Sequence, residues 1–219
     1  MSGETTAELS AKPRLRGWLH AGMAPAALAG GVVLIVLAPP RARIAVAVYV
    51  LSALLLFTVS AVYHRFTWGP RVRATLQRLD HANIFLIIAG SYTPFAVLLL
   101  DPGPARTLLW VVWAGALAGV AFRVFWVGAP RWLYVPVYIA LGWTAVFFLP
   151  EFLHTGGAAV LALIVVGGLL YSVGAAVYAL KRPNPSPRWF GFHEVFHAFT
   201  LGGFAAQYAA ISIAVVALR

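Results

Sequence analysis

The chain has 219 residues, of which 62% are hydrophobic and only 10% are charged, whereas soluble domains carry roughly 25% charged residues. This composition excludes a soluble globular protein and indicates a membrane protein, and the absence of cysteine excludes disulfides, thiolate nucleophiles and Cys-ligated metals. The net charge of +10 comes from Lys and Arg in short connections between apolar runs, which predicts contact with lipid headgroups and no nucleic-acid partner.

A polar tail, residues 1–17, comes first, and we expect it to be mobile and cytoplasmic. The apolar run after it is about 20 residues long, which exceeds a signal-peptide core and predicts an uncleaved first span. Seven such runs follow one another with short, proline-containing connections. The sequence therefore predicts an all-α, polytopic membrane protein whose residues 18–219 form one domain of seven transmembrane helices. The predicted spans are about 18–38, 44–65, 80–100, 106–127, 131–150, 157–180 and 191–217.

The distribution of basic residues predicts the orientation, because Lys and Arg are retained on the cytoplasmic side. With the N-terminus inside, only four of the 16 lie outside: Arg41, Arg43, Arg106 and Arg219. This asymmetry predicts a cytoplasmic N-terminus and an external C-terminus, in the inner (plasma) membrane of the cell. It also places four of the six histidines in one layer on the cytoplasmic side. They are His64, His81, His193 and His197.

His193 and His197 lie four residues apart, so on a helix they project from one face about 6 Å apart and suit one metal ion. A stable zinc site needs a third protein ligand, and His64, at the end of the second predicted span, is the best candidate. Three neutral imidazoles leave a tetrahedral zinc one open position for a water, whose pKa falls to about 7. The sequence thus predicts a Zn²⁺ site at His64, His193 and His197.

Asp80 and Ser60 are the candidate catalytic residues. Asp80, expected at the start of the third span, would hold or deprotonate the water and partly offset the charge of the ion. Ser60 shares a helix face with His64, from which it can donate a hydrogen bond to a carbonyl or to the water. Simpler roles also fit both residues: Asp80 as the N-cap of its helix, and Ser60 bonding back to the carbonyl four residues earlier.

The remaining histidines and Glu194 are weaker candidates. His81 lies about 100° around the helix from Asp80, which favours a supporting or interfacial role over a ligand role. Glu194 points away from the helix face of the two histidines by the same angle, so it would contact a neighbouring group or the headgroup layer. His20 and His154, at the ends of the first and fifth predicted spans, are expected to be interfacial.

Three motifs occur in order, each at a predicted helix end: Ser60 to His64 (SAVYH), Leu79 to Pro94 (LDHANIFLIIAGSYTP) and His193 to His197 (HEVFH). Together they resemble the hemolysin III family of bacterial membrane proteins. This family is related to the progestin and adipoQ receptors, which include the adiponectin receptors, and more distantly to the alkaline ceramidases.

The resemblance implies seven helices with the N-terminus inside and a zinc ion held by His64, His193 and His197. It places Asp80 against the zinc-bound water and Ser60 in the lining of the site. It further implies hydrolysis of lipid amide or ester bonds, as in the ceramidase relatives, or a role in membrane-lipid homeostasis. The chain departs from its relatives at Gln207, where many of them carry a further histidine.

We therefore expect a zinc-dependent hydrolase or lipid-homeostasis factor, with membrane lipids and a lipid substrate or fatty acid as partners. Three alternatives stay open. An intramembrane metalloprotease would use Glu194 as base, because residues 193–197 fit the pattern His-Glu-x-x-His. A receptor, transporter or haemolysin-like pore would carry a structural zinc with a fourth protein ligand such as His81. A haem-binding electron carrier would use histidines from two helices as axial ligands.

Overall fold

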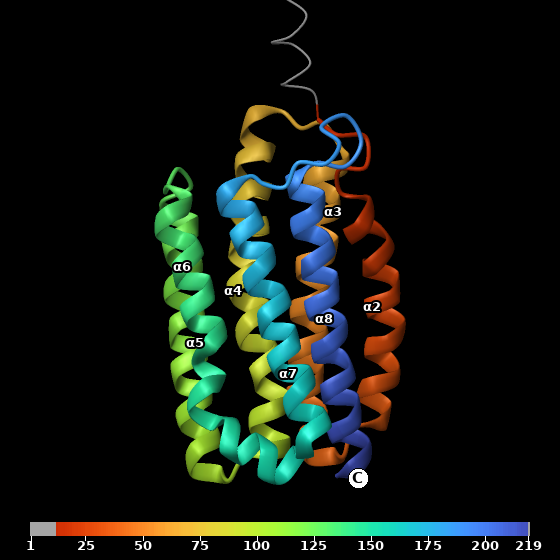
Figure 1. The fold of residues 1–219 in the computed structure, drawn as a ribbon, viewed down its shortest axis with the longest axis vertical. Helices are drawn as coiled ribbons and strands as arrows, with labels where there is room; N and C mark the ends of the chain where they lie inside the picture. The colour runs from red at the N-terminus through yellow and green to blue at the C-terminus, as the bar shows by residue number, and fades with distance from the viewer. Residues whose placement is uncertain (1–11, 219) are drawn as a thin grey trace, which may run out of the picture.

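The computed structural model describes residues 12–218, and within them the chain is all-helical, with no β-strand. The helices stand side by side in one bundle (Figure 1), which confirms the all-α prediction. Residues 1–11 of the predicted tail lie outside the described residues. The elements are α2 (Trp18–Leu37), η1 (Pro40–Ala42), α3 (Arg43–Arg65), α4 (Pro70–Leu99), α5 (Pro102–Phe125), α6 (Arg131–Gly142), η2 (Trp143–Phe148), α7 (Leu149–Leu180) and α8 (Phe192–Ala217).

Six segments are long and apolar enough to cross a membrane. Five of them contain α2, α3, α4, α5 and α8, and the sixth is the 50-residue segment Arg131–Leu180. This sixth segment contains α6, η2 and α7, and Figure 1 shows that the chain reverses direction within it, so that α6 and α7 lie next to each other. The spans predicted at 131–150 and 157–180 both fall within this one segment, in which α6 ends at Gly142 and α7 begins at Leu149.

The reversal between α6 and α7 depends on residues that satisfy or relax the backbone. Gly157 has φ 78° and ψ 173° inside α7, a conformation that glycine adopts without steric cost. The Tyr92 hydroxyl donates to the carbonyl of Gly142 at 2.5 Å and accepts from the amide of Ala145 at 2.8 Å. Since lipid supplies no hydrogen bonds, an irregular backbone at membrane depth needs such partners from the protein.

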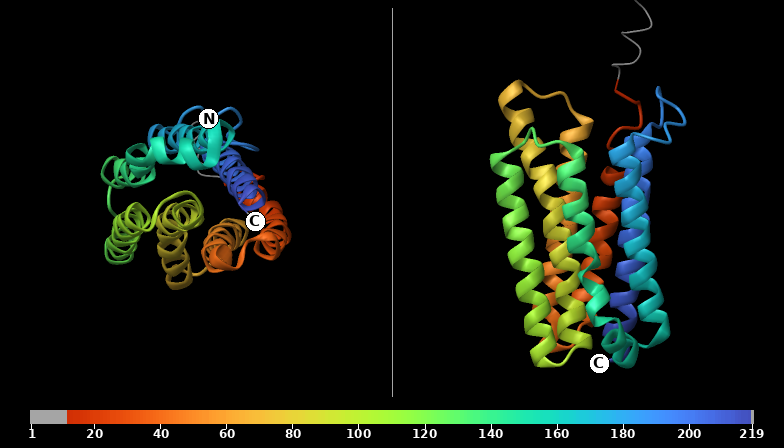
Figure 2. Two further views of the ribbon diagram at one scale, coloured as in Figure 1. Left: turned by 90° about the horizontal axis from the view of Figure 1, so that it is seen from below. Right: turned by 60° about the vertical axis from the view of Figure 1, so that its left-hand side comes forward.

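Helix α4 is the central element of the bundle. In its most apolar window 72% of the residues are buried, against 22% in α2 and 28% in α5, whose outer faces remain free for lipid. It packs against α3 and α5 and also contacts α6, α7 and α8, and the view along the bundle shows it between α3 and α5 (Figure 2). The Asn83 side chain ties it to α3 by donating to the carbonyl of Leu55 at 3.0 Å.

Helix α4 begins ten residues earlier than the predicted start at residue 80, because Pro70 occupies its first turn and the polar residues after it continue the helix. Gly69, not Asp80, is the N-cap. The N-cap role considered for Asp80 is therefore wrong, and Asp80 lies inside the helix with its side chain buried. The Asp80 carboxylate is therefore not used to cap the helix and is available for other contacts.

The N-terminal residues and the loop before α8 lie together at one end of the bundle, and the C-terminus lies at the other (Figures 1 and 2). The amides of Arg14 and Leu15 donate to the carbonyls of Arg188 and Trp189 at 3.0 and 3.1 Å. The Arg14 guanidinium also lies 4.5 Å from the centre of the Trp189 ring. Residues 12–17 are therefore joined to the loop that leads into α8.

Cations are crowded at this end. Burial, followed by the charges of Arg16, Arg65 and Arg73, lowers the pKa of Lys12. Because the Lys12 ammonium also donates to the carbonyl of Phe66, just after α3, the N-terminal residues contact the ends of both α3 and the 181–191 loop.

We predict that Tyr92→Phe lowers the free energy of unfolding by about 2–4 kcal/mol, since it leaves a buried carbonyl and a buried amide without a partner. Urea titration in detergent micelles measures the loss. The matched control is Tyr208→Phe, whose hydroxyl donates at 2.9 Å to the Gly30 carbonyl, inside the regular helix α2. Equal losses in the two variants would contradict the role assigned to Tyr92.

Candidate metal centre

The last turn of α3 and the first two turns of α8 meet at the end of the bundle that carries the N-terminal residues. His64 comes from α3, and His193 and His197 come from α8. One ring nitrogen from each of the three lies within 4.8 Å of the others, and the Nε2 atoms of His64 and His193 are 3.1 Å apart. Zn–N bonds of about 2 Å in a tetrahedral site separate the nitrogens by about 3.3 Å. The group therefore fits one metal ion with small side-chain movements.

Asp80 and Ser60 lie beside these histidines. The Asp80 Oδ2 atom is 3.5 Å from His64 Nε2, and Ser60 comes from the same helix as His64, one turn before it. Both side chains are buried, and both line one cavity together with His193 and His197. His64 joins the group through its contacts with His193 and Asp80, so the five predicted site residues lie near one another, from α3, α4 and α8.

The donor set itself indicates which ions fit. Three imidazoles and one carboxylate, with no sulfur ligand, suit Zn²⁺ and other borderline divalent ions better than Ca²⁺ or Mg²⁺, which prefer sets of oxygen ligands. The centre is also largely enclosed, because His64 and His197 are buried. A buried dication needs nearby negative charge, and Asp80 is the carboxylate that lies closest to the imidazoles in the described structure.

Glu194 holds the start of α8 and does not serve the histidines. Its Oε2 atom accepts from the amide of Gly191 at 2.8 Å, and its Oε1 atom is paired with the guanidinium of Arg16. The side chain is only 1% exposed. Because both carboxylate oxygens are engaged, none is left to act as the general base of a metalloprotease. Its partners are therefore Gly191 and Arg16, not the metal site or the headgroup layer.

His20 is not interfacial, and that prediction is wrong. The residue is 2% exposed, and its ring stacks on His197 with centroids 3.8 Å apart and an angle of 12° between the planes. The physical reason is Gly17, whose φ of 81° starts α2 directly against α3, and where a Cβ would lie 2.9 Å from the Cβ of His64. Neither ring nitrogen of His20 has a hydrogen-bond partner among the described residues. His154, in contrast, is exposed.

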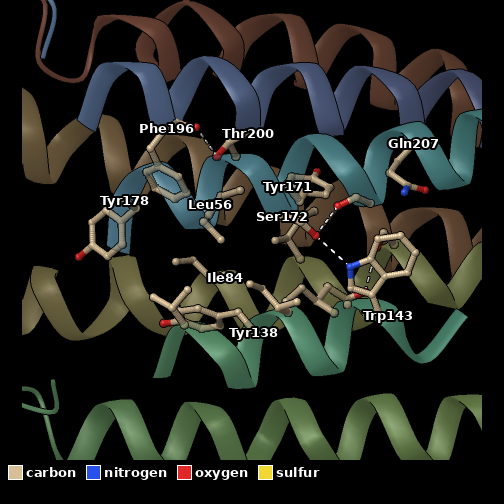
Figure 3. Close-up of a pocket in the computed structure, with 18 of the residues that line it drawn as sticks. Leu56, Ile84, Tyr138, Trp143, Tyr171, Ser172, Tyr178, Phe196, Thr200 and Gln207 are labelled. Carbon is tan, nitrogen blue, oxygen red and sulfur yellow. Dashed lines mark hydrogen bonds between the residues drawn. The ribbon is translucent and has the colours of Figure 1, made fainter. Parts of the chain in front are cut away.

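The cavity next to the histidines has a volume of about 140 Å³, room for on the order of ten water molecules. Its lining follows α8 from His193 to Gln207, which corresponds to roughly 21 Å of helix. Most of the wall is apolar, and Leu56 and Ile84 are among the apolar side chains in the close-up (Figure 3). Gln207 lies at the end remote from the histidines and donates to the carbonyl of Ile164 at 3.3 Å.

We predict that Glu194→Gln destabilises the protein by about 2–4 kcal/mol, because it removes one partner of a largely buried ion pair. It should leave metal binding intact, since Glu194 contributes no ligand. Thermal unfolding in detergent and metal analysis provide the two measurements. Glu151→Gln, which changes an exposed acid in the first turn of α7, is the matched control. Loss of the metal without loss of stability would contradict this assignment.

These observations define the class of protein: a multi-pass helical membrane protein with a candidate metal centre of three histidines inside the bundle. Comparison with known proteins agrees. The family model described as "Haemolysin-III related" matches residues 10–208. The chain belongs to this haemolysin III family, as its three motifs predicted, and its place in the inner membrane is consistent with the bacterial relatives.

Individual relatives cover most of the chain. It is 34% identical over 161 residues to the Hemolysin-3 homolog of Bacillus subtilis (strain 168), which covers 74% of this chain and 72% of that protein. It is 33% identical over 167 residues to Hemolysin-3 of Bacillus cereus, with 76% and 73% covered. It is 25% identical over 169 residues to the human monocyte to macrophage differentiation factor, with 75% and 67% covered.

Proposed function

We propose that this protein is a zinc-dependent hydrolase of lipid amide or ester bonds, or a lipid-homeostasis factor that uses the same centre. One observation carries the proposal: three histidine nitrogens lie within 4.8 Å of one another, and two of these histidines, with Asp80, line an apolar cavity inside a membrane-spanning bundle. A metal centre beside an apolar cavity suits the hydrolysis of an amide or ester bond that carries an apolar chain. Membrane lipids contain such bonds.

In this proposal each leg of Arg131–Leu180 crosses the bilayer, which gives seven spans. The end of the bundle that holds the N-terminal residues and the 181–191 loop faces the cytoplasm, since most of the Lys and Arg residues lie in the connections at this end. The C-terminus then lies outside. The metal centre lies just beneath the inner headgroups, where water enters from the cytoplasm and a lipid from the inner leaflet.

His64, His193 and His197 would hold the zinc ion through one nitrogen each. The ion supplies a Lewis acid that polarises a carbonyl and activates water for attack. The Asp80 carboxylate orients the attacking water, accepts its proton and passes it to the leaving amine or alcohol. The Ser60 hydroxyl donates a hydrogen bond to the carbonyl oxygen. His20, stacked on His197, fixes the plane of that ligand ring.

The size of the cavity supports an acyl chain as the bound group. Its lining extends roughly 21 Å along α8, while one leaflet contributes about 15 Å of the hydrocarbon core. The wall offers apolar side chains along most of this length, and the imidazoles and the carboxylate of Asp80 lie at one end of it. A fatty-acyl group would therefore place its carbonyl at the metal centre and its chain against the apolar wall.

Metal analysis tests the site. We expect the purified wild type to hold about one zinc per chain and His64→Ala to bind zinc at least tenfold more weakly, because two imidazoles on one helix make a poor site. The control is His154→Ala, which removes an exposed histidine outside the site. A wild type that binds no zinc from a metal-buffered solution, or a His64→Ala variant with unchanged affinity, would refute the centre.

The catalytic assignment is tested by a pair of acid variants on a panel of N-acyl and O-acyl lipids in detergent, with fatty-acid release read by mass spectrometry. Asp80→Asn should retain zinc and lose about 10²- to 10⁴-fold in rate, the usual contribution of a general base. Glu194→Gln should keep its rate per folded, zinc-loaded molecule. The opposite pattern would favour the metalloprotease mechanism.

A receptor, transporter or pore with a purely structural zinc is the second candidate. His20 favours it, because its buried ring is stacked on His197 and both of its nitrogens lack a protein partner. A fourth histidine that closes the coordination sphere would leave no position for water. The absorption spectrum of the Co²⁺-substituted protein separates the two candidates, since a fourth histidine ligand would be lost in His20→Phe.

A further inference from the structure

Arg123, in the last turn of α5, is a buried cation inside the bundle. Its side chain is 1% exposed, and its guanidinium lies 4.3 Å from the centre of the Tyr134 ring. One of its nitrogens, Nη2, lies 2.6 Å from Nδ1 of His81, and its other contacts are the carbonyls of Trp126 and Val127. No carboxylate within residues 12–218 forms an ion pair with it. Its charge is therefore shared with His81, a ring and two carbonyls.

Burying a cation away from water costs free energy, so a buried arginine inside a membrane bundle is a candidate functional residue. An ionisable side chain within a membrane span is rare and faces the bundle interior. Arg123 lies on the helix next to α4, and its strongest side-chain partner is a histidine that follows Asp80 directly. The contact therefore reaches the edge of the metal centre.

The contact fixes the tautomer of His81. Arginine is always charged and offers only hydrogen-bond donors. Nδ1 of His81 must then accept, so it carries a lone pair, and the proton of the neutral ring is on Nε2. A doubly protonated His81 would place two donors, both cationic, against each other at 2.6 Å. The structure thus makes His81 a neutral imidazole with a single N–H group.

That N–H group faces away from α5. The two nitrogens of an imidazole point in widely different directions, so with Nδ1 on Arg123, Nε2 points away from that helix. His81 lines the same cavity as Asp80 and Tyr138, and the Tyr138 hydroxyl donates to the His81 carbonyl at 3.3 Å. Tyr138 and Arg123 therefore hold the carbonyl and Nδ1 of His81, and the residue also lines the cavity.

We propose that His81 donates a hydrogen bond from Nε2 to the carbonyl or carboxylate oxygen of the bound acyl ligand, and that Arg123 is the positioning residue that keeps His81 neutral and protonated at Nε2. The ligand class rests on the proposed function; the tautomer does not. His81 holds one oxygen of the ligand in place while its other ring nitrogen is occupied by Arg123. The pair forms a polar contact separate from the three metal-binding histidines.

Nitrogen-15 NMR of histidine-labelled protein in detergent tests the tautomer, with His81→Gln identifying the signal. We expect wild-type His81 to be one species protonated at Nε2, because Arg123 occupies Nδ1. Arg123→Met should add the other tautomer or a charged form. Tyr134→Phe, which keeps the ring under the guanidinium, should change nothing. A wild-type ring that is charged or protonated at Nδ1, or an unchanged signal in Arg123→Met, overturns the proposal.

Binding of palmitate to the zinc-loaded protein tests the donor. His81→Phe should keep its zinc and bind palmitate at least tenfold more weakly, since it loses a hydrogen bond to a charged group, and His81→Gln should recover part of the affinity. Equal affinity in wild type and His81→Phe overturns this inference alone. If the wild type binds no palmitate, both the acyl ligand class and the donor role of His81 are refuted. If it binds palmitate but hydrolyses no lipid, only the hydrolase activity is refuted.

Discussion

The lack of water in the hydrocarbon core is the constraint on which this structure depends. Polar groups there need partners within the protein, and side chains of the bundle supply them at irregular points of the backbone. Tyr92 serves the reversal between α6 and α7, and Asn83 joins α4 to α3. The same constraint makes the three histidines a candidate binding site. Three imidazoles gathered in an apolar bundle cost free energy unless they share an ion or a ligand.

Hydropathy and periodicity predicted most of the fold, since length and apolar content alone define a helix that crosses a membrane. They placed α2, α3 and α8 to within a residue or so, because each is bounded by Gly, Pro or a charged residue. They missed the early start of α4, where the residues after Pro70 form a helix without being apolar. They also missed η2, because a 3-10 segment stabilised by a distant tyrosine leaves no local pattern.

In the site, too, features with a local sequence signal were predictable, and features that depend on distant contacts were not. His193 and His197 were predictable because they share one helix, and the spacing of four residues is a local signal. The inclusion of His64 followed from topology and family motifs. His20 and Arg123 were not predicted, because their roles depend on which helices become neighbours. Gly17 brings His20 to the site by a backbone turn, and the contact between Arg123 and His81 joins residues 42 positions apart.

Residues 12–17 belong to the same structural unit as the histidines. Gly17 touches His64, Arg16 is paired with Glu194 at the start of α8, and the backbone of Arg14 is bonded to the loop before that helix. Residues 12–17 thus complete their contacts only when α8, the last helix described, is in place. A nascent chain that stops short of α8 holds His64 and Asp80 without the two histidines of α8, so the centre closes only when the last helix has been made.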